Sequence, residues 1–175
     1  MRPRPFLLLL AGFALAFWVG LDDASASEEL PDLTVAPENI TLEMNGVISN
    51  ASAIKDGDTV TVRVDVSNNG SADADDVRVE IFYYPKKVPE DQDDIDNLIN
   101  KGFELDEGKN TYIYSLYKKS TNLKAGATKS LASADWIIEG GEWYVEVRVD
   151  YDEDDTDNGE ILETNENNND ARYPE

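Results

Sequence analysis

The stretch TVTVRVDVS, residues 59–67, alternates apolar and polar side chains without a break. Successive side chains of a β-strand point to opposite faces, so this pattern predicts a strand with one dry and one wet face. β-branched residues suit such a half-buried surface. A strand with one wet face indicates an antiparallel sheet rather than a parallel sheet covered by helices. The dry face carries Val60, Val62, Val64 and Val66, and Arg63 and Asp65 lie opposite.

Two further stretches repeat this alternation, at residues 77–83 and 143–150. Asn69-Gly70 and similar turn sequences separate the runs, because Asn and Gly readily adopt the positive φ angles of tight reversals. Weaker strand signals occur at 33–35, 40–44 and 111–117, and residues 127–138 are less regular. About seven short strands joined by turns predict an all-β fold of two packed antiparallel sheets, a β-sandwich.

The N-terminal residues 1–26 have the organisation of a secretory signal peptide. A basic start precedes an apolar run at 6–21, and Ala24-Ser25-Ala26 supplies the small residues that a signal peptidase reads. The alternative is an uncleaved membrane anchor, although sixteen residues are short for a span of about 20. We therefore expect cleavage after Ala26 and a single domain over residues 27–175.

Charge and composition exclude several function classes. The chain carries 37 acidic and 15 basic residues, a net charge of -22, which disfavours nucleic acid and anionic lipid as partners. It has no cysteine and no histidine, which excludes thiol or Ser-His catalysis and metal sites built from those side chains. Only carboxylate chemistry stays open, and a glycosidase needs two acids across a cleft. We expect no enzyme.

Residues 85–110 form a long insertion between two predicted strands. Ile95, Leu98 and Ile99 have helical spacing, and acidic residues precede them, where the helix dipole favours negative charge. We expect a short helix or helical turn over a sheet edge. The segment either covers that edge or acts as a recognition loop.

The densest acidic segment, residues 150–160, is a candidate calcium site. Ca²⁺ takes six to eight oxygen ligands, and closely spaced aspartates on a strand end offer them. A solvated hairpin loop explains the same residues without a metal. The candidate ligands are Asp150, Asp152, Asp154, Asp155 and Asp157, and Ca²⁺ is the one cofactor that the sequence suggests.

Other candidate surface features are glycosylation sites and outward-facing aromatic residues. Asn39, Asn50 and Asn69 begin Asn-X-Ser/Thr triplets, which accept glycans in exported proteins. Trp143 has core parity. Phe82, Tyr84 and Tyr144 have outward parity, so they either line a binding face or pack beneath the 85–110 segment.

The order of motifs resembles the CARDB family, a cell-adhesion-related domain found in bacteria and archaea. The matching segments are PDLTV (31–35), DGDTVTVRVDVSNNG (56–70), SADADDVRV (71–79), LKAG (123–126), GEWYVEVRVD (141–150) and ILETNENNN (161–169). The resemblance implies an immunoglobulin-like or fibronectin-III-like sandwich with adhesion or spacer roles and no catalysis. The 85–110 insertion departs from the compact family pattern.

The last segment carries the most specific family pattern, I-x-E-x-N-E-x-N-N. We expect its side chains to tie an irregular connection to its neighbours, because buried backbone groups need partners and Asn is suited to turns. Ile161 is the expected buried anchor of this connection. The other pattern residues are Glu163, Asn165, Glu166, Asn168 and Asn169.

These observations lead to one functional expectation with two alternatives. We expect a secreted or cell-surface adhesion or binding module whose partner is an extracellular protein or polysaccharide. It contacts a membrane only if the N-terminal segment stays uncleaved. The alternatives are a Ca²⁺-stabilised carbohydrate-binding module and a carboxylate-dependent hydrolase.

Export gives the first testable prediction. Expression of the full chain in an archaeal or bacterial secretion host should release a protein whose N-terminal sequencing starts at Ser27. A membrane-bound product that retains residues 1–26 would support the anchor instead.

Overall fold

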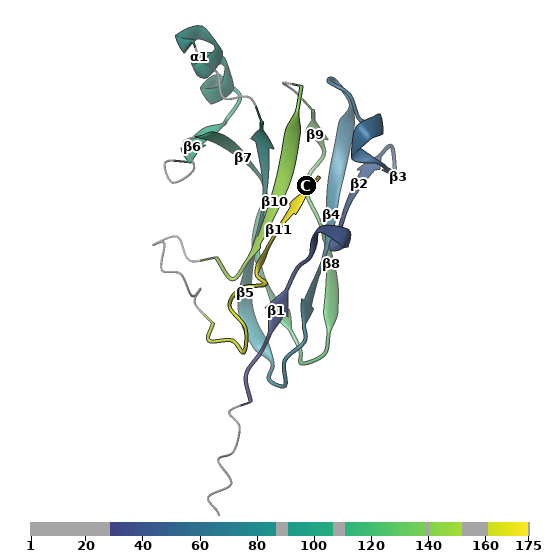
Figure 1. Cartoon of the computed structure of the whole chain (residues 1–175), viewed down its shortest axis with the longest axis vertical. Helices are drawn as coiled ribbons and strands as arrows, with labels where there is room; N and C mark the ends of the chain where they lie inside the picture. The colour runs from purple at the N-terminus through teal and green to yellow at the C-terminus, as the bar shows by residue number, and fades with distance from the viewer. Residues whose placement is uncertain (1–28, 87–90, 107–110, 139–140, 152–160, 175) are drawn as a thin grey trace, which may run out of the picture.

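The computed structural model describes residues 29–86, 91–106, 111–138, 141–151 and 161–174, and it consists of two antiparallel β-sheets packed face to face (Figure 1). One sheet contains β1 (Leu33–Thr34), β2 (Ile40–Met44), β3 (Val47–Ser49), β4 (Thr59–Asn68), β8 (Thr128–Ala132) and β9 (Trp136–Ile137). The other contains β5 (Ala74–Pro85), β6 (Glu104–Asp106), β7 (Thr111–Leu123), β10 (Trp143–Val149) and β11 (Asp170–Tyr173). Two short 3₁₀ turns, η1 (Pro37–Asn39) and η2 (Ala51–Ala53), flank the first sheet's strands. This immunoglobulin-like β-sandwich confirms the predicted fold class.

Strand β4 organises the six-stranded sheet. It pairs with β1 and β2 along one side and with β8 and β9 along the other. The four predicted core valines of β4 are buried, as the alternation indicates. The irregular 127–138 run becomes two strands, since Ser133 Oγ between them accepts the hydrogen bond of the Val62 N–H at 3.0 Å.

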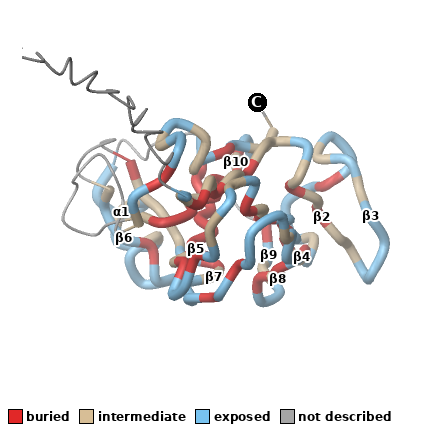
Figure 2. The backbone as a smooth tube through the Cα atoms, turned by 90° about the horizontal axis from the view of Figure 1, so that it is seen from below, coloured by how far each residue is buried: buried red, intermediate tan, exposed pale blue. Residues whose placement is uncertain are grey.

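The five-stranded sheet runs in the order β11-β10-β5-β7-β6, and its inner face meets the valines of β4. The inward residues predicted for 77–83 and 143–149 are buried, Trp143 among them. The buried parts of the two sheets face each other across the interior in the view from below (Figure 2). Each buried aliphatic side chain contributes about 1.5–3 kcal/mol of burial free energy.

Aromatic rings contributed by both sheets and by the insertion pack together in this core. Trp136 stacks on Tyr114 with a centroid distance of 4.0 Å, and Tyr83 lies 6.0 Å from both Phe103 and Trp143. Phe103 belongs to the insertion and is buried. The insertion is therefore anchored in the core and is not an independent loop on the surface.

The insertion contains the predicted helix, α1 (Gln92–Asn100), but its position differs from the expectation. The Asp91 side chain caps it by accepting the Asp94 N–H at 2.9 Å. No residue of α1 is buried, and the helix stands at the end of the sheet (Figure 1). The sequence predicts a helix that lies over an edge of the sheet. That edge is formed by strand β6, which pairs with β7. None of the described helices is long and apolar enough to cross a membrane.

The fully buried amide of Asn68 joins three segments at one end of the sandwich. Its Oδ1 accepts the N–H groups of Asp32 (3.1 Å) and Gly70 (3.0 Å). Its Nδ2 donates to the carbonyls of Ala72 (2.8 Å) and Leu123 (3.1 Å). All four bonds are made to backbone groups, so one side chain satisfies the turn after β4, the approach to β1 and the end of β7.

Gly70 allows the close approach of two segments at this end of the sandwich. A Cβ atom at this position would lie 2.4 Å from the Leu30 carbonyl oxygen. Any larger residue would therefore push the N-terminal segment away from the turn.

Replacing Asn68 with Asp tests this joint. The carboxylate keeps the shape but cannot donate to the Ala72 and Leu123 carbonyls, so we expect a loss of about 3 kcal/mol or more in the free energy of unfolding. Urea denaturation monitored by tryptophan fluorescence measures it. The matched control is Asn69→Asp, which adds the same charge at an exposed neighbour and should change stability by about 0.5 kcal/mol or less. Equal effects of the two substitutions would contradict the role of Asn68.

Candidate binding site on the outer face of the five-stranded sheet

The outer face of the five-stranded sheet is buried where the alternation predicts a wet surface. Glu80, Phe82 and Tyr84 of β5 and Glu146 of β10 have outward parity, and each is at most 6% exposed. Cross-strand neighbours on β10 and the edge strand β6 cover them. A second, polar and aromatic layer therefore lies on the side of the sheet that faces away from the core.

Arg148 lies at the centre of this layer. Its Nε pairs with Glu146 at 2.6 Å, and the other oxygen of Glu146 accepts from Arg172 at 2.8 Å. The guanidinium also lies 4.8 Å from the ring centroids of Phe82 and Tyr151. The buried carboxylate of Glu146 is thus neutralised by two arginines, as a charge out of water requires.

The Tyr84 hydroxyl links this layer to the insertion. It accepts from Arg148 Nη2 at 2.7 Å and donates to Asp106 Oδ2 at 3.1 Å. Asp106 also pairs with Arg148 at 3.5 Å. These bonds tie β6, whose backbone pairs with β7, to the outward side chains of β5 and β10.

Burial and charge keep these groups in fixed protonation states. Burial raises the pKa of Tyr84 well above its usual value, and the negative charge of Glu146 raises it further. Burial lowers the pKa of Arg148, but Glu146 outweighs this and leaves it raised. The phenol therefore stays neutral and the guanidinium stays charged at any physiological pH.

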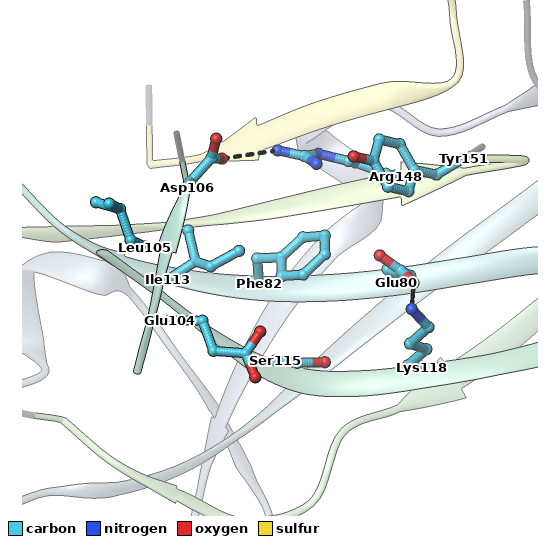
Figure 3. A pocket seen from close by; sticks show the side chains of 10 residues that line it. All are labelled: Glu80, Phe82, Glu104, Leu105, Asp106, Ile113, Ser115, Lys118, Arg148 and Tyr151. Carbon is cyan, nitrogen blue, oxygen red and sulfur yellow. Dashed lines mark ion pairs between the residues drawn. The ribbon is translucent and has the colours of Figure 1, made fainter. Parts of the chain in front are cut away.

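A pocket of about 460 Å³ opens between β6 and the sheet (Figure 3). A β-bulge shapes its floor, since the register of β5 and β7 shifts between Ile81 and Phe82, and bulges re-aim side chains beside functional sites. Its walls carry three acids (Glu80, Glu104, Asp106), two bases (Lys118, Arg148), Ser115, and the apolar or aromatic side chains of Phe82, Leu105, Ile113 and Tyr151.

Glu80 is the most deeply buried acid of the pocket. Its carboxylate is 1% exposed, and the ammonium group of Lys118 lies 2.9 Å from Oε1. The two residues are cross-strand partners on β5 and β7. The Lys118 side chain is 50% exposed, so the counter-charge of this buried acid comes from the rim of the pocket.

The aromatic residues with outward parity pack instead of forming a platform. Phe82 and Tyr84 are buried, and Tyr84 bonds to Asp106 of the insertion, which matches packing beneath the 85–110 segment. Tyr144 is half-buried and stacks on Tyr84 with centroids 4.7 Å apart.

Of the candidate calcium ligands, the described residues contain only Asp150. Its backbone has a φ of 54°, and its Oδ2 accepts the Ile161 N–H at 2.8 Å. Asp152, Asp154, Asp155 and Asp157 lie outside the described residues, so calcium binding stays a prediction. Within the described part of the chain, no group of three or more acids is arranged to hold a metal ion.

Residues 161–169, called the crossing below, lead into β11. Side-chain hydrogen bonds hold them to one another and to the segment around β1. Glu163 is buried, accepting the Leu33 N–H on Oε2 and the Asn169 amide on Oε1 at 2.9 Å. Glu166 accepts the Glu163 N–H at 2.8 Å, and Asn168 donates to Asp32 at 2.9 Å.

The other family-pattern residues of this crossing lie nearer the surface. Asn165 accepts the Asn167 N–H at 3.1 Å. Ile161, the expected anchor, is only half-buried against the core, and Glu163 is the more deeply buried residue.

The three candidate glycosylation residues lie outside the pocket. Asn50 and Asn69 are exposed, and Asn39 is half-buried in η1, where its Oδ1 accepts the Ala36 N–H at 3.0 Å. Glycosylation of these residues stays a prediction.

Comparison with protein families gives a match to the CARDB model over residues 30–172. The chain belongs to the CARDB family. The name denotes a cell-adhesion-related domain, and the family is non-catalytic. Comparison with curated proteins gives no significant match.

The similar solved structures include two CARDB domain structures from one Pyrococcus furiosus protein. A crystal structure in complex with di-metal ions is 21% identical, covers 82% of this chain and 85% of that one, and has a TM-score of 0.48. A solution structure is 20% identical, covers 82% and 92%, and has a TM-score of 0.49. A β-glucosidase involved in saponin metabolism from intestinal bacteria is 13% identical, covers 68% of this chain and 14% of its own, and has a TM-score of 0.37.

Sequence reasoning did not find the pocket of this CARDB domain. Glu80, Lys118 and Arg148 read as ordinary wet-face residues in alternating strands. The available signal was the pair Phe82 and Tyr84 on the supposedly wet face directly before the insertion. Large aromatic side chains at outward positions indicate that something covers them.

Glu163 gives a pH-dependence prediction. Burial raises its pKa from 4.5 to about 7, although the hydrogen bonds from Leu33 and Asn169 act in the opposite direction. The folded state therefore holds a proton that the unfolded chain releases, so stability is lost as pH rises through about 7. The shift corresponds to about 3 kcal/mol between pH 4.5 and about 7.5.

The control is Glu163→Gln, which keeps the shape without the titrating proton. The Asn169 Oδ1 has no donor among the described residues, so this amide can turn to accept the new N–H group. Urea denaturation across this pH range should show the wild type losing about 3 kcal/mol more than the variant. Parallel stability curves would contradict the assignment.

Proposed function

We propose that this CARDB chain is an exported, non-catalytic adhesion or binding module that contacts its partner through the outer face of the five-stranded sheet. One observation carries the proposal: the pocket of about 460 Å³ between β6 and the sheet. Its walls belong to paired strands and to the buried network around Arg148, so the surface is organised before any partner arrives. Preorganisation lowers the entropic cost of binding.

Several features of the pocket support binding rather than a chemical reaction. Asp106 is bonded to Tyr84 and Arg148, and Glu80 is paired with Lys118. Glycoside hydrolysis needs one acid with a raised pKa and a second carboxylate across the scissile bond. Both of these acids are already engaged by cations of the same chain.

A protein partner is better supported than a polysaccharide. Sugar-binding surfaces present exposed aromatic faces, whereas Phe82 is buried and Tyr144 stacks on Tyr84. The carbohydrate-binding alternative, with or without Ca²⁺, therefore has less support from the described residues. We propose a location at the cell surface or outside the cell, which the predicted signal peptide supports.

The proposal is tested by attachment. Beads carrying the secreted protein are mixed with intact cells of the source organism, and bound cells are counted. The variant is Ser115→Phe, which fills the pocket without a change in charge. The control is Ser120→Phe, at an exposed position on the same strand β7 outside the pocket lining.

We expect wild type and Ser120→Phe to retain cells, and Ser115→Phe to lose most of that attachment. Equal attachment of all three proteins would refute a role for the pocket. Absence of attachment by the wild type would refute the adhesion function itself.

A further inference from the structure

We infer that the pocket accepts the lysine or arginine side chain of a basic segment in a partner protein. This inference rests on the proposed function and assigns its partner class. It follows from which charges in the pocket are already paired, from the apolar walls, and from the charge of the whole chain.

The two bases of the pocket are committed to acids of the same chain. Arg148 bonds to Glu146 and Tyr84 and pairs with Asp106, and its faces are covered by two aromatic rings. Lys118 neutralises the buried Glu80 at 2.9 Å. An anionic ligand would have to break these pairs and leave a buried carboxylate without a counter-charge, which is costly.

Glu104 is the acid that remains available. It is exposed on β6, its side chain lies beside Ser115 in the pocket (Figure 3), and it has no hydrogen-bond or ion-pair partner among the described residues. Three acids and two bases give the lining a net charge of -1. A single positive charge on a ligand brings the pocket to neutrality.

The walls next to Glu104 are suited to a methylene stem. Ile113, the cross-strand partner of Glu104 on β7, lies beside it and Phe82 forms the floor, whereas Leu105 points to the other side of β6 (Figure 3). Lysine and arginine bury their aliphatic stems along such apolar surface while the charged head reaches a polar group. The Ser115 hydroxyl offers the head a second oxygen acceptor.

The net charge of -22 also favours a basic partner, because it acts over longer distances than the pocket contacts. A strongly acidic protein attracts basic partners and accelerates their association. β6 is also the last strand in the order of its sheet, and Leu105 on it is 50% exposed. An extended segment of another protein can lie along such an edge with one side chain in the pocket. A small free polyamine would not use that edge.

The experiment measures binding of a fluorescein-labelled peptide with three lysines alternating with glycines, by fluorescence anisotropy in moderate salt. The same peptide with acetylated lysines is the neutral control. Full-length secreted protein is compared with Glu104→Gln, Ser115→Phe, and two matched controls. Glu38→Gln removes one exposed acid on η1, outside the pocket lining, and Ser120→Phe adds the same ring elsewhere on β7.

We expect the lysine peptide to bind and the acetylated peptide not to bind. Glu104→Gln should weaken binding about fivefold, as loss of an exposed ion pair does. Ser115→Phe should weaken it by at least as much, and both controls should stay within about twofold of the wild type. Unfolding curves of each variant establish that the fold is intact.

Equal loss in Glu38→Gln and Glu104→Gln would mean that the chain acts as a general polyanion, which overturns the inference. Displacement of the peptide by spermidine at equal concentration would identify a free polyamine as the ligand and overturns it as well. If cell attachment depends on Ser115 while the lysine peptide ignores the pocket, the proposed function stands and only this partner class is refuted.

Discussion

The rest of this structure depends on one constraint: buried backbone N–H and C=O groups outside the strand ladders need hydrogen-bond partners. Such groups gather where β1, the turn after β4 and the end of β7 meet. Asn68 meets it with four hydrogen bonds to backbone groups. Glu163 does the same at β1, where it accepts the backbone N–H of Leu33, and the Asn169 side-chain amide donates to its other oxygen. Hydrophobic burial drives the two sheets together, but it has no direction. These two side chains fix how β1, the turn after β4 and the final crossing join.

A second polar layer on the five-stranded sheet follows the same rule and creates the pocket. Glu146 is buried between two arginines. The Tyr84 hydroxyl extends this hydrogen-bond network to Asp106. The insertion adds the strand β6 and the buried aromatic residue Phe103 to the sandwich. The insertion is thus held in two ways: Phe103 packs in the core, and Asp106 bonds to the polar layer on the outer face. The helix α1 has no fully buried residue and contacts the core through the partly buried Leu98.

The buried acids of the pocket and of the crossing have different kinds of partner. In the pocket each buried acid has a cation close by, as Glu80 has Lys118. In the crossing Glu163 is held only by neutral donors, and burial raises its pKa to about 7. The same residue type is therefore paired with a cation in one place and held by neutral donors in the other. For a chain with a net charge of -22, such local pairing decides which acids are available to a partner.

The sequence by itself determined the sheets, because the alternation at 59–67, 77–83 and 143–150 is local and needs only the period of a strand. It also predicted a short helix within 85–110, although not its position, and the polar pattern after Ile161. Only the tertiary structure decided that Glu80, Phe82 and Glu146 are buried on the outer face, since residues far apart in sequence cover them. Parity along a strand predicts which face a side chain takes but not what lies above that face. The pocket arises from that covering, so no single stretch of the chain encodes it.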